Sequence, residues 1–80
     1  MKIPRKIRAK ELIKFLSQFG YYPTRQKGSH IRLSKSDGSH HITIPNHEPL
    51  KIGTLNSIIN DLSNHMNVSK ETLIELLLEY

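Results

Sequence analysis

One histidine, His30, stands among positive charges in a short stretch of this chain that could carry out acid–base chemistry. Arg25 and Lys27 precede it and Arg32 follows it. Imidazole is the side chain whose ordinary pKa allows it to accept or donate a proton near neutral pH. Cations beside it would hold an anionic substrate, such as a phosphodiester, and stabilise charge that develops in the reaction. The residue types therefore indicate a site that acts on a polyanion.

The distribution of charge also favours a polyanionic partner. Residues 1–35 hold ten Lys/Arg and one acidic residue, whereas residues 36–80 hold two Lys/Arg and six acidic residues. The formal charge is therefore +9 in the first part, −4 in the second and +5 overall. A basic face of this kind attracts nucleic acids and steers their approach. Random clustering of solvated charges is the competing interpretation.

Length and composition exclude several classes of protein. Eighty residues form one small domain, which we expect to span residues 1–80. The chain has no cysteine, which rules out disulfides and thiolate chemistry. No apolar run approaches the ~20 residues of a membrane span, and residues 1–5 do not begin a secretory signal. We expect a cytosolic protein with no membrane partner.

The N-terminal third predicts a basic extended arm followed by a helix. Residues 1–8 form the arm, with Ile3 and Ile7 expected to touch the core. Apolar residues then recur at helical spacing over residues 9–19. They are Leu12, Phe15, Leu16 and Phe19. Gly20 fits the left-handed position that closes a helix, whereas Arg8 is a poor N-cap and leaves the helix start defined only to within a turn.

Three short strands are expected next, over residues 21–26, 29–35 and 39–45. Pro23 favours an edge position for the first strand, because proline cannot donate to a ladder. A type I′ turn at Asp37-Gly38 would join the second and third strands. This register would gather Ile31, Leu33, Ile42 and Ile44 on one face and leave His30, Arg32, Ser34, His41 and Thr43 on the other.

The turn before His30 is compatible with two registers. A two-residue turn at Lys27-Gly28 would place Arg25 opposite His30. A three-residue loop over residues 26–28 would place Thr24 there instead. In either case the backbone turns beside His30.

The remaining chain predicts two helices. Gly53 or Thr54 would cap the first, after a loop over residues 46–52, and the helix would run to about Ser63. Residues 64–67 would separate it from a final helix that is capped by Ser69 and runs from Lys70 to about Glu79. That helix has too many apolar residues for one stripe, so some must dock on the domain or on a partner. The fold class is α+β, with an antiparallel sheet, helices on one face and the other face open.

The order of these motifs resembles the HicA family of toxin ribonucleases (mRNA interferases) from HicA–HicB toxin–antitoxin modules. The resemblance is carried by Gly20-Tyr21, by residues 25–30, by Ile44-Pro45-Asn46-His47 and by residues 51–55. It extends from Lys10 to the C-terminal segment. It implies an α-β-β-β-α domain like the double-stranded-RNA-binding domain, plus a short C-terminal helix. It also implies mRNA as substrate, a HicB-type antitoxin as partner and no cofactor.

In this resemblance His30 occupies the position of the family's catalytic histidine, acting as general acid or base. The expected substrate-binding residues are Arg25, Lys27, Gly28, Ser29, Arg32 and Lys51. His47 follows Pro45, which the predicted register places opposite His30, so it is a candidate second acid or base; capping its own loop is the competing role. His40, near the turn, is expected to be solvated, and His65, in the loop between the two helices, is expected to have no functional role. A metal site is not expected, because no metal-ligand pattern accompanies His30.

Two other functions remain open at this level. A non-catalytic double-stranded-RNA-binding module would need only the basic face. Such modules also carry basic residues at the start of the last helix, where this chain offers only Lys51, followed by Asn56, Ser57 and Asn60. A protein-interaction scaffold would use the leucine-rich C-terminus, but it leaves the basic half unexplained.

Overall fold

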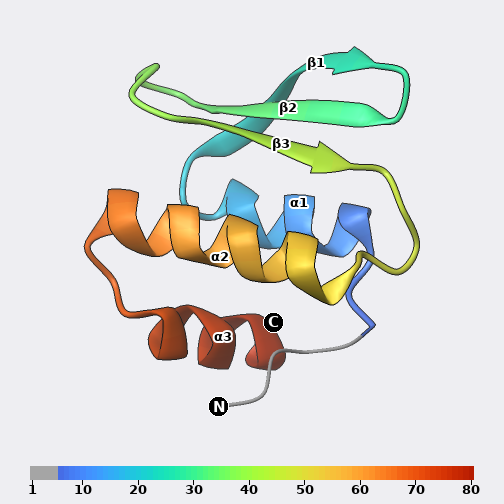
Figure 1. The fold of residues 1–80 in the computed structure, drawn as a ribbon. Coiled ribbons are helices and arrows are strands. Elements are labelled where there is room, and N and C mark those ends of the chain that lie inside the picture. The colour runs from blue at the N-terminus through green and yellow to red at the C-terminus, as the bar shows by residue number, and fades with distance from the viewer. Residues whose placement is uncertain (1–5) are drawn as a thin grey trace.

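The computed structural model describes residues 6–80, in which three helices accompany one three-stranded antiparallel sheet. The elements are α1 (Ala9–Ser17), β1 (Tyr21–Lys27), β2 (His30–Lys35), β3 (His41–Pro45), α2 (Ile52–Met66) and α3 (Lys70–Glu79). The strands lie in the order β1-β2-β3, so β1 is an edge strand, as Pro23 predicted. The expected α+β class and its α-β-β-β-α order with a terminal helix are confirmed (Figure 1).

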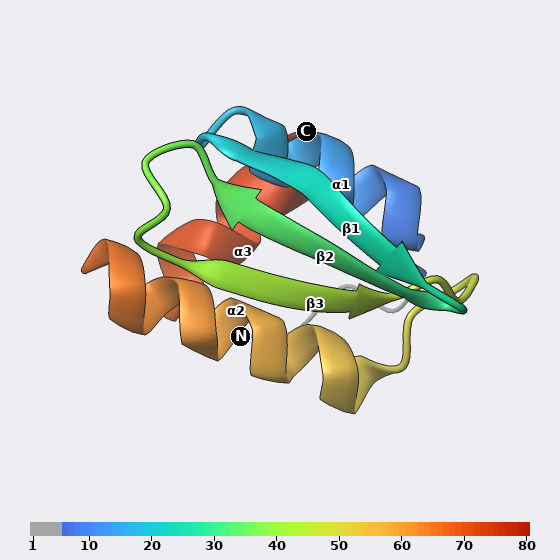
Figure 2. The same ribbon diagram turned by 90° about the horizontal axis from the view of Figure 1, so that it is seen from above.

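The molecule has three layers (Figure 1). The sheet covers α1 and α2, and α3 lies on the far side of these two helices. None of the three helices within residues 6–80 lies on the opposite face of the sheet, as the view onto that face shows (Figure 2). Ile7 packs on the core as expected, whereas the predicted contact of Ile3 lies outside the described residues. No helix within residues 6–80 is long and apolar enough to cross a membrane.

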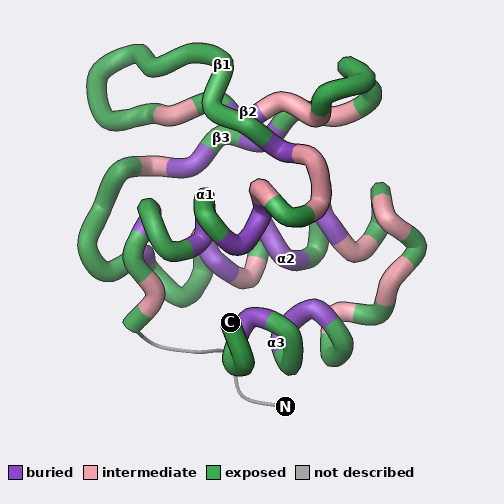
Figure 3. Tube along the Cα trace, turned by 180° about the vertical axis from the view of Figure 1, so that it is seen from behind, coloured by how far each residue is buried: buried purple, intermediate pink, exposed green. Residues whose placement is uncertain are grey.

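The core lies between the sheet and helices α1 and α2 and continues between these helices and α3 (Figure 3). Its buried residues are Ala9, Leu12, Phe15, Leu16, Tyr21, Leu33, Ile42, Ile44, Leu50, Leu55, Ile58, Ile59, Leu62, Leu73, Ile74 and Leu77. The predicted stripe of α1 is therefore buried, except that Phe19 is only partly buried because α1 ends at Ser17. Helix α1 begins at Ala9 although Arg8 is a poor cap, because the Glu11 carboxylate accepts a hydrogen bond from Arg8 N (3.1 Å).

Helix α3 uses only part of its apolar surface. Leu73, Ile74 and Leu77 are buried against the other helices, whereas Leu76 and Leu78 are 42% and 62% exposed. The final residue, Tyr80, holds the end of α3 on α1. Its hydroxyl donates to a backbone carbonyl of α1 (3.0 Å), and its ring meets a phenylalanine ring edge-on.

The register predicted for the second hairpin is confirmed, but its turn differs. Leu33 lies opposite Ile42, and both are buried. Asp37 does not have the positive φ that a type I′ turn requires at its first central position. Residues 36–40 connect the strands instead, with Gly38 at φ 77° and with the N–H of Lys35 donating to the carbonyl of His40 (2.9 Å), and β3 begins at His41. Hydrogen bonds from the Ser39 hydroxyl and N–H lower the pKa of Asp37, so they favour the charged carboxylate in this turn.

Neither register expected for the first hairpin forms. Lys27 lies directly opposite His30, and Gly28-Ser29 is the turn. The register shifts between Pro23 and Arg25, which makes Thr24 a β-bulge. Strict alternation would place Tyr21 and Arg25 on the same face of β1. The bulge changes the alternation, so that Tyr21 is buried while Arg25 and Lys27 lie on the face without helices.

Helix α2 is longer at both ends than predicted. It starts at Ile52, two residues after the buried Leu50, whose N–H donates to the carbonyl of Ile7 (2.8 Å). It continues past Ser63 to Met66 and ends where Asn67 adopts a left-handed φ of 56°. The predicted final helix, with Ser69 accepting a hydrogen bond from Thr72 N, is confirmed.

Candidate active site

The face of the sheet that carries no helix presents an ordered array of side chains, which we call the open face. Strand pairing arranges it in three rows, each with one residue from β1, β2 and β3. The rows are Lys27–His30–Pro45, Arg25–Arg32–Thr43 and Tyr22–Ser34–His41. The first two rows hold four of the residues that the sequence singled out.

A surface hollow of about 270 Å³ occupies the first two rows. It is lined by Arg25, Lys27, His30, Arg32 and Thr43, all of them exposed. We call it the His30 hollow. Its three cations approach the histidine from two strands. The acidic residues of the chain all lie outside the strands, so no carboxylate on the sheet offsets these charges. The hollow can therefore attract an anion and place it beside an imidazole.

The turn next to His30 is held in place by backbone contacts. Gly28 has a φ of 58°, in the left-handed region that glycine adopts readily. The carbonyl of Ser29 accepts a hydrogen bond from Asn46 N (2.6 Å). This contact ties the loop after β3 to the residue that precedes His30. His30 therefore begins its strand between a tight turn and a tethered loop.

Four predicted site residues do not line the His30 hollow. Gly28 and Ser29 form the turn beside it, and Lys51 and His47 lie further along the chain. Lys51 precedes α2, beyond the loop that follows β3, and is exposed. His47 is also exposed, and its N–H donates to the carbonyl of Pro45 (2.9 Å). His47 comes two residues after the direct partner of His30. It is therefore close along the chain to the hollow but does not line it.

Thr43 is the residue of the hollow that sequence reasoning passed over. Its face was predicted correctly from the register, yet its side chain suggested no chemistry. Its place opposite Arg32 was the signal that could have identified it.

A family model for the HicA toxin of bacterial toxin–antitoxin systems matches residues 9–63. The match runs from the start of α1 into α2 and contains all three strands and the whole His30 hollow. This chain belongs to the HicA toxin family. As a HicA toxin it is one half of a toxin–antitoxin module, which implies an antitoxin partner. No curated protein and no solved structure matches the chain.

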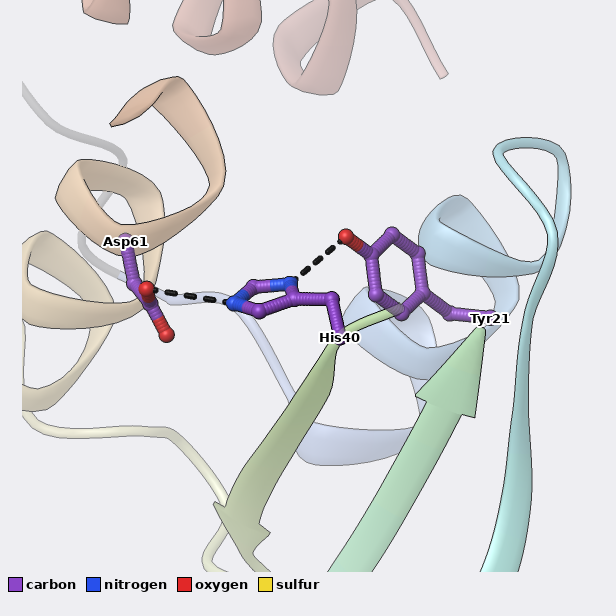
Figure 4. A network of polar contacts seen from close by, with 3 residues as sticks. All are labelled: Tyr21, His40 and Asp61. Carbon is purple, nitrogen blue, oxygen red and sulfur yellow. Dashed lines mark hydrogen bonds and ion pairs between the residues drawn. The ribbon is translucent and has the colours of Figure 1, made fainter. Parts of the chain in front are cut away.

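The HicA toxin also contains a polar network that the sequence did not predict (Figure 4). His40, expected to be solvated, has a side chain that is only 15% exposed. Its Nδ1 lies 2.8 Å from the Tyr21 hydroxyl and its Nε2 lies 3.2 Å from the Asp61 carboxylate. The ring of His65 stacks on it, with ring centres 4.2 Å apart. The network joins the start of β3 to α2 on the helical side of the sheet, away from the His30 hollow.

Tyr21 should make the stability of the toxin fall at alkaline pH. Burial raises the pKa of its hydroxyl above the ordinary value, and the carboxylates of Asp61 and Asp37 raise it further. The neutral hydroxyl is therefore favoured in the folded state. The unfolded chain loses this proton first as the pH rises past about 10, and the contribution to stability is lost as the pH rises through the folded pKa.

We expect the urea midpoint of the wild type to fall between pH 8 and pH 10.5, with a smaller fall for Tyr21→Phe. At pH 8 the variant should be less stable by about 1 kcal/mol, because His40 loses a hydrogen-bond partner. Tyr22→Phe, at an exposed tyrosine, should keep the full alkaline fall. Equal falls in the wild type and Tyr21→Phe would contradict the assignment to Tyr21.

Proposed function

We propose that this HicA toxin is an endoribonuclease that cleaves mRNA and so arrests translation in the cytoplasm. His30 acts as general acid or base, and Arg25, Lys27 and Arg32 bind phosphates of the substrate. The observation that carries the proposal is the His30 hollow, in which one imidazole and three cations share an exposed face without carboxylates. Membership of a toxin family supports a damaging activity but does not identify it.

The reaction that suits these groups uses the substrate's own 2′-hydroxyl as nucleophile. A base removes its proton, the 2′-oxygen bonds to the adjacent phosphorus, and the bond to the 5′-oxygen breaks as an acid protonates that oxygen. The cations stabilise the negative charge that builds on the phosphate oxygens. The products are a 2′,3′-cyclic phosphate and a 5′-hydroxyl. A serine nucleophile is not needed, and Ser29 lies in the turn, where His30 is poorly placed to activate it.

His47 is the candidate for the second proton transfer. It lies at the same end of the sheet as His30, in the loop that Asn46 ties to the carbonyl of Ser29. The wall of the hollow does not include it. Its participation therefore requires the substrate to extend past Pro45 towards this loop. Gly28 and Ser29, with backbone groups at the turn, and Lys51 at the start of α2 would contact outer phosphates of the same strand.

We propose a HicB-type protein as the antitoxin partner, with a surface that covers the open face. An acidic surface would complement the three cations of the His30 hollow. Blocking this hollow would exclude RNA from His30 and would explain neutralisation without any change in the fold of the toxin.

The proposal is tested by incubating the purified protein with a synthetic mRNA in excess EDTA and analysing the fragment ends. We expect fragments that carry 2′,3′-cyclic phosphates and 5′-hydroxyls, because no step uses a metal ion. Fragments that carry 5′-phosphates would indicate a different nucleophile. Intact mRNA that is nevertheless bound would favour the alternative, a non-catalytic double-stranded-RNA-binding module. In that case His30→Ala would retain most of the RNA affinity and would have no activity to lose.

A further inference from the structure

The third row of the open face has no role in the proposed cleavage. It consists of Tyr22 on β1, Ser34 on β2 and His41 on β3. Tyr22 is 52% exposed and His41 is also exposed, so two aromatic side chains lie on the solvent side of the sheet. Packing in the core does not account for an aromatic residue at position 22, because Tyr21 is the buried tyrosine of this pair and Tyr22 is exposed.

Hydrogen bonds restrict this row. The Nδ1 of His41 lies 2.7 Å from the Ser34 hydroxyl, which itself lies 2.8 Å from the hydroxyl of Thr24. Thr24 is the bulged residue, and the bulge is what allows Tyr22 and Arg25 to share a face. The same bulge thus supplies the hydroxyl of Thr24 that contacts Ser34 beside His41, and it places Arg25 on the same face as the ring of Tyr22.

The row continues directly from the His30 hollow. Ser34 is four residues after His30 on β2, a separation of ~13 Å along a strand. Arg25 and Arg32 lie in the row between them. A nucleic-acid strand whose phosphates contact these arginines would therefore bring a neighbouring nucleotide over Tyr22 and His41. The lack of carboxylates on the sheet matches a negatively charged occupant.

We propose that Tyr22 and His41 form a base-stacking subsite for an unpaired segment of the RNA, next to the hollow that binds its phosphates. This inference rests on the proposed ribonuclease function and adds the class of substrate, which is single-stranded RNA. Bases in a duplex have both faces covered by their neighbours, whereas unpaired bases can stack on aromatic side chains. The subsite binds any base, because every base has a flat face, and Ser34 is a positioning residue for His41.

The test measures binding in a His30→Ala background, so that the RNA stays intact. Affinity is determined by fluorescence anisotropy for three labelled probes of equal length: a single-stranded oligoribonucleotide, its abasic ribose-phosphate counterpart and a duplex. We expect Tyr22→Ala to weaken binding of the first probe about tenfold, within the range that loss of one stacked base produces. Binding of the abasic probe and of the duplex should stay unchanged. Tyr22→Phe should bind like the parent, because it keeps the ring.

Tyr80→Ala is the matched control, since Tyr80 is 54% exposed but lies after α3, away from the open face. Tyr80→Ala should not change the affinity for any of the three probes. Thermal unfolding is measured for every variant to establish that the variant is folded. The stacking proposal is overturned if Tyr22→Ala weakens the base-containing and abasic probes equally, or weakens neither. Cleavage by the protein with His30 intact is measured separately. Base-dependent binding without cleavage would refute the ribonuclease proposal and support the stacking subsite. Cleavage without base-dependent binding would support the ribonuclease proposal and refute the stacking subsite.

Discussion

Replacing His30 with alanine is expected to slow RNA cleavage by roughly 10²- to 10⁴-fold, the usual contribution of a positioned acid or base. RNA affinity should change only a few-fold, because the three cations that line the His30 hollow remain. Induced expression of the wild type should arrest growth and fragment mRNA, and His30→Ala should do neither. The separation of rate from affinity is what distinguishes a proton-transfer role from a phosphate contact.

Single-turnover cleavage with saturating protein measures the chemical step without a contribution from binding. His65→Ala is the matched control, because His65 is an exposed histidine on α2, on the other side of the sheet. It should cleave at the wild-type rate. The proposal for His30 fails if both variants keep wild-type activity. His47→Ala in the same assay decides the second role: a loss as large as that of His30→Ala would identify the second proton-transfer group, and an unchanged rate would leave His47 as a loop residue.

The parts of the fold that follow from local pattern were predictable. The second hairpin is an example, because only one register buries Leu33, Ile42 and Ile44 together. The same parity argument correctly places His30 and Arg32 on the open face, since residues that alternate with the buried ones must point the other way. The helical stripe of α1 and the cap of α3 were equally local features.

The sequence did not reveal features that depend on distant partners. No residue type around Thr24 indicates a β-bulge in the sequence. The bulge allows Tyr21 to be buried in the core while Arg25 lies on the open face. Because the sequence does not reveal the bulge, it also does not allow the pairing of Lys27 with His30 to be deduced. The environment of His40 depends on Asp61, which is 21 residues away in the sequence and comes within reach only when α2 packs on the sheet. Both features come from tertiary packing.

Arg32 is expected to be the most important cation for substrate binding. It occupies the centre of the open face, between Arg25 on β1 and Thr43 on β3, and shares a strand and a face with His30. A charge-assisted hydrogen bond contributes about 1.5–3 kcal/mol. We therefore expect Arg32→Ala to lower kcat/KM by roughly 10- to 150-fold. Arg32→Lys should recover only part of this loss, because lysine keeps the charge but lacks the planar fork that binds two phosphate oxygens.

Salt dependence separates a direct phosphate contact at Arg32 from a general effect of net charge. Each phosphate neutralised on a single strand contributes about 0.7 to the slope of log affinity against log salt concentration. Arg32→Ala should reduce the magnitude of that slope by about this amount. Lys10→Ala removes the same charge from an exposed position on α1 and should leave both slope and kcat/KM nearly unchanged. Equal losses in the two variants would mean that overall charge, and not the arrangement of the His30 hollow, attracts the RNA.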